Sequence, residues 1–114
     1  MSAKGGRIGI RMKGKKQYSV SKGAIFSTVY DIIELQNGDM ILSDTARGLL
    51  YYKLTMYDYV WELMYSITEI GYEKSDVTLR LIGDRQDKVQ EIRREFALLE
   101  AMLGGGADVT IMDN

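Results

Sequence analysis

The first apolar pattern along the chain, over residues 7–13, repeats with a period of two. Its apolar members, separated by basic or small residues, are Ile8, Ile10 and Met12. A period of two is typical of a β-strand with one buried and one solvated face. After this strand we expect a turn over residues 14–16 and a second short strand over residues 17–20.

Two apolar-rich runs lie within residues 26–44, on either side of Asn37 and Gly38. Asn-Gly accommodates the positive φ angles of a type I′ turn, so the pattern predicts a two-residue β-hairpin. In the resulting register Asp31 faces Asp44 at the open end of the hairpin. The core side of this hairpin would hold Val29, Ile33, Leu35, Met40 and Leu42.

The next segment favours a strand followed by a helix. Residues 49–54 predict a third strand of an antiparallel meander. Thr55 and Asp58 have the spacing of a capping box, and Gly71 is a typical helix terminator, so a buried helix is expected to run to about Ile70. Its broad apolar face would combine two stripes, Val60, Leu63, Ile67 and Ile70 with Tyr57, Trp61 and Met64.

The last third of the chain predicts a strand, a helix and a strand. The first strand covers residues 77–82, and Asp84 is the expected N-cap of the helix that follows. Glycines at 104–106 end this helix, and a strand over residues 107–112 closes the order. The apolar stripe of the helix has heptad spacing and consists of Val89, Ile92, Phe96, Leu99 and Leu103. Such a stripe can pair two copies in a homodimer, but we expect it to pack on the sheet.

Together these elements predict an α+β fold, a two-layer sandwich with a mixed β-sheet and two helices packed on one face. An N-terminal antiparallel meander would be followed by the order α-β-α-β. We expect residues 1–114 to form a single α+β domain, in which residues 1–6 are a flexible basic tail.

Charge is segregated along the chain. All seven charged residues among residues 1–30 are basic, whereas residues 31–114 hold eight basic and sixteen acidic residues. The overall charge of -1 therefore hides a basic segment on an acidic body. This arrangement suggests a polyanionic partner, an acidic protein surface or the body of a second copy.

The composition argues against most catalytic chemistry. The chain contains no cysteine and no histidine, which excludes disulfides, thiolate chemistry, histidine-based triads and the common zinc sites. We therefore expect a protein that is not an enzyme and has no cofactor and no metal. A magnesium or calcium site at Asp31 and Asp44 is conceivable, but a fraying hairpin end or a bridging Arg47 explains the pair better.

No apolar run reaches the length of a signal-peptide core or a membrane helix. We therefore expect a cytoplasmic protein without a membrane partner.

The leading candidate site is the basic N-terminal strand with its turn. A row of cations on such a strand could contact phosphates and position the protein without reading the base sequence. The candidate residues are Arg7, Arg11, Lys13, Lys15 and Lys16. This site predicts a non-enzymatic binding protein that contacts nucleic acid or a nucleic-acid-containing complex. An edge strand protected by lysine is the purely structural explanation of the same pattern.

A tyrosine-rich segment supports a different function. Tyr52, Tyr59 and Tyr65 lie off the main apolar stripes, and we expect at least two of them to be exposed as a protein interface. The alternative function is a small inhibitor, antidote or adaptor protein, such as one encoded by a phage or mobile element. It would block a host defence or another protein partner through this Tyr-rich surface or an acidic surface.

Overall fold

In the computed structural model, the described residues are 10–56, 59–83, 88–104 and 109–112. They form two helices and six strands in one sheet. The elements are β2 (Ile10–Tyr18), α1 (Lys22–Leu35), β3 (Asp39–Asp44), β4 (Leu49–Met56), β5 (Tyr59–Gly71), β6 (Lys74–Gly83), α2 (Lys88–Met102) and β7 (Val109–Met112). The strand order across the sheet is β3-β4-β5-β6-β2-β7.

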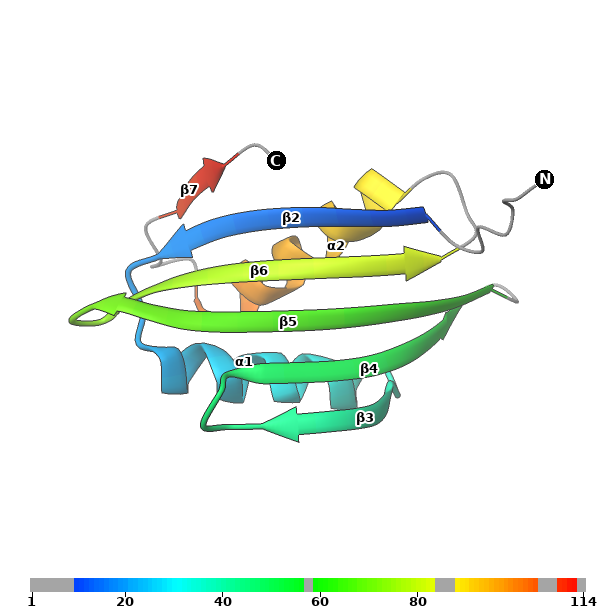
Figure 1. The fold of residues 1–114 in the computed structure, drawn as a ribbon, viewed down its shortest axis with the longest axis horizontal. Helices are drawn as coiled ribbons and strands as arrows, with labels where there is room; N and C mark the ends of the chain where they lie inside the picture. The colour runs from blue at the N-terminus through cyan, green and yellow to red at the C-terminus, as the bar shows by residue number, and fades with distance from the viewer. Residues whose placement is uncertain (1–9, 57–58, 84–87, 105–108, 113–114) are drawn as a thin grey trace.

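The molecule has two layers. Figure 1 shows α1 and α2 together behind the sheet, so both helices cover the same face. The other face, which neither described helix covers, is called the open face below. This arrangement confirms the predicted α+β class and the packing of two helices on one face. All strand pairings within the described residues are antiparallel, so the sheet lacks the parallel pairs that the predicted mixed sheet would contain.

The predicted hairpin over residues 26–44 is wrong, because its first arm is helix α1. Ser21 caps this helix by accepting a hydrogen bond from the Ala24 backbone N–H at 3.2 Å. The buried side chains of α1 recur at helical spacing and are Ile25, Val29, Ile32 and Ile33. The expected core positions Leu35 and Leu42 are 65% and 45% exposed.

The Asn-Gly signal marks a real turn of another kind. Asn37 has a φ of 59°, and the Gly38 N–H donates to the Ile33 carbonyl oxygen at 2.9 Å. These contacts end the helix and lead into β3. The positive φ expected at Asn37 was correct, but the turn that contains Asn37 joins a helix to a strand instead of two strands.

The predicted helix over residues 55–70 is also wrong, because residues 55–56 end strand β4 and residues 59–70 lie in strand β5. Trp61, Leu63, Tyr65 and Ile67 are all buried and recur with a period of two. Val60 and Ile70, which the helical stripe placed in the core, are 51% and 43% exposed. The apolar residues fit both periods, and pairing with β4 and β6 selects the strand.

The predicted turn over residues 14–16 is wrong as well, because β2 continues through it to Tyr18. The glycine has a packing role instead. A Cβ atom at Gly14 would lie 2.7 Å from Ile92 Cγ2 and 3.1 Å from Phe96 Cε2. Gly14 therefore lets α2 approach the sheet closely.

Other predicted elements agree with the structure. The strands expected at 49–54 and 77–82 lie within β4 and β6, and β7 lies within the expected closing strand. Ile92, Phe96 and Leu99 of α2 are buried against the sheet. Three further predictions lie outside the described residues: the helix cap Asp84, the capping-box residue Asp58 and the flexible tail over residues 1–6. Neither described helix is long and apolar enough to cross a membrane.

Candidate functional site

A wholly buried carboxylate, Glu95 of α2, lies between the helices and the sheet. Its Oε1 accepts hydrogen bonds from the hydroxyls of Tyr52, at 2.6 Å, and Tyr65, at 2.8 Å. These tyrosines come from the helix-facing sides of β4 and β5. Their rings are parallel within 6°, with centroids 6.4 Å apart. The carboxylate is therefore hydrogen-bonded to side chains of two adjacent strands of the sheet.

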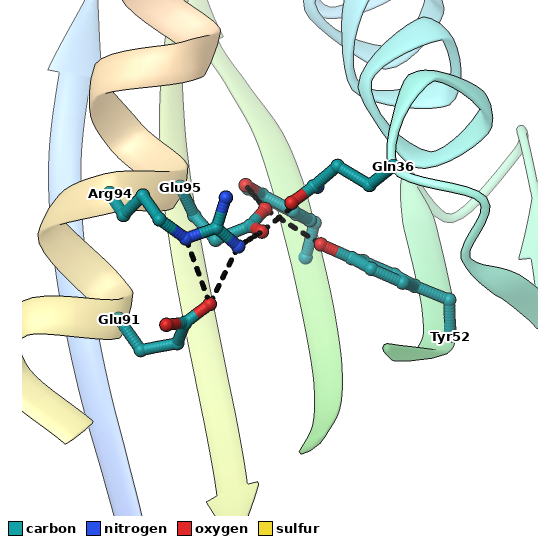
Figure 2. Close-up of polar contacts among 6 residues, drawn as sticks. Gln36, Tyr52, Glu91, Arg94 and Glu95 are labelled. Atoms are coloured by element: carbon teal, nitrogen blue, oxygen red, sulfur yellow. Dashed lines mark hydrogen bonds and ion pairs between the residues drawn. The ribbon is translucent and has the colours of Figure 1, made fainter. Parts of the chain in front are cut away.

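The second oxygen of Glu95 faces the two helices. Its Oε2 accepts from Gln36 Nε2 at 3.0 Å and from Arg94 Nη2 at 3.1 Å. Arg94 also holds Glu91, with Nη2 at 2.6 Å and Nε at 3.0 Å from Glu91 Oε2. Figure 2 shows Gln36 and Tyr52 pointing toward Glu95 from one side and Arg94 joining the two glutamates on the other. We call Gln36, Tyr52, Tyr65, Glu91, Arg94 and Glu95 the carboxylate cluster.

Burial decides the protonation of the two phenols. It raises the pKa of Tyr52 and of Tyr65 far above the usual value, and the negative charge of Glu95 raises both further. Both hydroxyls therefore keep their protons and act as donors. Burial alone would lower the pKa of Arg94, but its hydrogen bond to Glu91 and the charges of Glu91 and Glu95 outweigh this, so Arg94 stays charged.

A second polar group joins β2 to α2. Glu100 accepts from Lys16 Nζ at 2.8 Å and from the Tyr18 hydroxyl at 2.9 Å. Burial is the main reason that the pKa of Tyr18 is raised, and the hydrogen bond to Glu100 adds to it. Lys16 Nζ also lies 5.1 Å from the centre of the Phe96 ring. Lys16 therefore points toward α2 and serves the packing of the two layers.

The structure divides the predicted basic row between two faces. Lys13 is exposed and pairs in the strand register with Arg80 of β6, which is also exposed. Lys15 lies on the same side of β2 as Lys13, with Nζ 3.7 Å from Asp76 Oδ2. Lys16 faces the helices instead, so it does not belong to the row. Arg11 pairs in register with Ile82, and Arg7 lies outside the described residues.

The expected tyrosine interface consisted of Tyr52, Tyr59 and Tyr65. The prediction that they are exposed is wrong for Tyr52 and Tyr65, the two whose side chains are described. Tyr52 and Tyr65 are 0% exposed. For Tyr65 the expectation came from placing residues 55–70 on a helix, whereas strand alternation turns its side chain, like that of Tyr52, toward the core. The side chain of Tyr59 lies outside the described part of the structure. The sequence prediction of a buried Trp61 is confirmed, at 4% exposure.

Asp31 and Asp44 do not face each other, because Asp31 lies in α1 and Asp44 at the end of β3. Asp44 accepts from the Arg47 backbone N–H at 3.1 Å, and its Oδ2 lies 3.7 Å from Arg47 Nε. Among the residues described, no group of three or more acidic side chains is placed to hold a metal ion.

The carboxylate cluster was missed at the level of the sequence. One signal for it was present, because Glu95 stands between Ile92, Phe96 and Leu99 on the apolar stripe of α2. A carboxylate on an apolar helix face needs partners in the core. The positions of those partners, Tyr52, Tyr65 and Gln36, follow only from the fold.

No protein-family model matches the chain. No curated protein is significantly similar to it in sequence. Several solved structures resemble its fold, and two of them are described here. A START superfamily protein from Mycobacterium smegmatis has a TM-score of 0.58 and 13% identity, over 83% of this chain and 94% of that one. The Zhui aromatase/cyclase from Streptomyces sp. R1128 has a TM-score of 0.60 and 10% identity, over 85% of this chain and 93% of that one.

At these identities the similarity shows the fold, which is the helix-grip fold of START-like proteins. A two-layer sandwich with an antiparallel sheet and two helices fits this description.

Proposed function

We propose that the protein is a non-enzymatic binding protein that takes a small organic molecule between the sheet and α2. The carboxylate cluster would be the polar anchor for this molecule. The observation that carries the proposal is the wholly buried Glu95, held by two phenols inside a largely apolar layer.

Stability alone is a weak reason for such a cluster. A buried ion pair is often no more stabilising than apolar side chains of the same volume, because removing charges from water is costly. Small-molecule sites, in contrast, typically combine apolar walls with a few convergent polar groups. The core residues Leu50, Leu63 and Leu79, which pair in the strand registers with Tyr65 or Tyr52, would supply such walls. One protein of similar structure is an aromatase/cyclase, which also favours a small organic ligand.

The protein carries its own reporter for this site. Trp61 is the only tryptophan and is buried on the helix-facing side of β5, two residues from Leu63. A molecule that enters between the layers should change its fluorescence. We would purify the full chain without denaturant, look for a bound small molecule by native mass spectrometry, and titrate a panel of aromatic and aliphatic compounds.

Two neighbouring tyrosines give a matched pair of variants for the same titration. Tyr52→Phe removes a hydroxyl inside the cluster, and Tyr51→Phe removes one on the open face. We expect binding to weaken about tenfold in Tyr52→Phe, a change worth about 1.4 kcal/mol, and to stay unchanged in Tyr51→Phe. Equal effects of the two substitutions, or no ligand at all, would contradict the proposal.

Contact with nucleic acid through the open face is a second candidate function. Lys13 and Arg80, which are paired and exposed on adjacent strands, favour it. Lys15 adds a third cation on this face, although Asp76 partly compensates its charge. Cations at neighbouring positions of adjacent β-strands can contact successive phosphates of a bound nucleic acid.

The test of this second function is a salt-dependent binding assay with short single- and double-stranded DNA and RNA. The double variant Lys13→Glu with Arg80→Glu should lose most affinity, and wild-type affinity should fall steeply between low and physiological salt. Arg47→Glu, a charge reversal at a side chain 78% exposed in the β3–β4 turn, is the control. Binding that is equally weak in all three proteins would remove this candidate.

A further inference from the structure

We infer that the ligand of the carboxylate cluster carries a cationic head, such as a protonated amine, which takes the place of the Gln36 amide at Glu95 Oε2. This inference rests on the proposed function, because it names the class of molecule that the same site would bind. It is carried by the charge of the cluster, by the hydrogen bonds that occupy Glu95 and by the end of α1.

The cluster has one positive charge for two negative charges. Glu91 and Glu95 are both buried, and within the described part of the chain Arg94 is the only cation in contact with either of them. The fourth hydrogen bond to Glu95 comes from Gln36, which is neutral. A cation at the position of the Gln36 amide would make the buried cluster neutral, which a low-dielectric interior favours.

The surroundings of Glu95 also suit a cation. The hydroxyls of Tyr52 and Tyr65 both donate to its Oε1, so a cation would meet the other oxygen, Oε2. Gln36 is the C-cap of α1, so the partial negative charge of that helix end lies within a side-chain length of Glu95. The last turn of α1 contains no basic residue that would neutralise it.

The geometry indicates how the head would reach the carboxylate. Gln36 is half-buried and follows the last residue of α1, so its side chain can turn toward solvent without moving the helix. The Arg94 side chain is 36% exposed, whereas that of Glu95 is 0% exposed. The side of Glu95 that carries Oε2 is therefore the side nearer to water, and the tyrosine side is closed.

Three probes with one apolar body test this inference on the full chain: 2-phenylethylamine, 2-phenylethanol and phenylacetate. Titrations followed by Trp61 fluorescence and calorimetry should show the amine binding at least about tenfold more tightly than the alcohol, with phenylacetate weakest. Glu91→Gln should reduce the preference for the amine severalfold, because Arg94 then serves Glu95 alone. Glu62→Gln, the same substitution at a tyrosine-bonded glutamate of the open face, should leave it unchanged.

A further pair of variants replaces the ligand's charge by one of the protein's own. Gln36→Lys should place an ammonium group near Glu95 and abolish binding of 2-phenylethylamine, whereas Gln36→Met should retain it. Equal affinities for the amine and the alcohol would overturn the cationic head and leave the proposed function standing. If none of the three probes binds and native mass spectrometry finds no ligand, the proposed function itself fails, and the inference falls with it.

Discussion

Strand β4 carries two adjacent tyrosines that make the same bond on opposite faces of the sheet. The Tyr51 hydroxyl donates to Glu62 on the open face, and the Tyr52 hydroxyl donates to Glu95 in the interior. The hydrogen bond to Glu62 raises the pKa of Tyr51, whereas burial is the main cause of the much larger rise for Tyr52. Water screens the first pair and is absent around the second.

Charged side chains on the two faces of the sheet differ in how completely they must be hydrogen-bonded. On the open face, charges such as Lys13 and Arg80 remain in water and can meet a partner at little cost. Between the layers each polar atom needs a partner, and Glu95 has four hydrogen bonds. A site in the interior is therefore selective for a ligand that can replace one of these bonds.

High pH should separate the two faces most strongly. Below pH 10 the tyrosines keep their protons in both the folded and the unfolded state. Above pH 10 the tyrosines of the unfolded state lose their protons, whereas buried Tyr52 and Tyr65 of the folded state keep theirs. The free energy of unfolding should therefore fall by about 3 kcal/mol for each pH unit above about 10, from these two residues. Thermal unfolding followed by circular dichroism between pH 8 and 11.5 measures this. A melting temperature that is the same at pH 8 and pH 11 would contradict it.

Removal of the carboxylates should have the next largest effect. Glu95→Ala removes the hydrogen-bond acceptor of two phenols, an amide and Arg94 inside the protein. We therefore expect the free energy of unfolding to fall by about 3–5 kcal/mol. Glu62→Ala, its counterpart on the open face, should cost about 0–1 kcal/mol. Urea unfolding of both variants gives the comparison. Similar losses of unfolding free energy in the two variants would mean that burial does not make the interior glutamate more important for stability than the one on the open face.

Removal of single hydroxyls should have the smallest effect of the three. Tyr65→Phe leaves Glu95 Oε1 with one donor in place of two, which should cost about 1–2 kcal/mol. Tyr51→Phe should change stability by less than about 0.5 kcal/mol. The same urea experiment measures both. A more stable Tyr65→Phe variant would show that the hydroxyl is held there at the expense of stability, as expected for a group kept for binding.

The sequence predicted the layer architecture and several elements correctly because their patterns were unambiguous. Residues 77–81 alternate strictly between apolar and polar, and Ile92, Phe96 and Leu99 repeat only at helical spacing. In 60–70 the apolar residues fit both a helix and a strand, and in 26–35 the Asn-Gly turn favoured a hairpin. Local preference could not decide these segments. The pairing of β5 with β4 and β6, and the packing of α1 against the sheet, decided them.

The candidate sites differ in the same way. The basic character of the N-terminal segment is a property of the sequence, and the strand register then assigned Lys13 and Lys15 to the open face and Lys16 to the interior. The carboxylate cluster is a property of the tertiary structure. Gln36, Tyr52, Tyr65 and Glu95 come from four separate segments, up to 59 residues apart. Their bonds exist only when α2 lies across the sheet, because a buried charge becomes stable only when all of its partners arrive together.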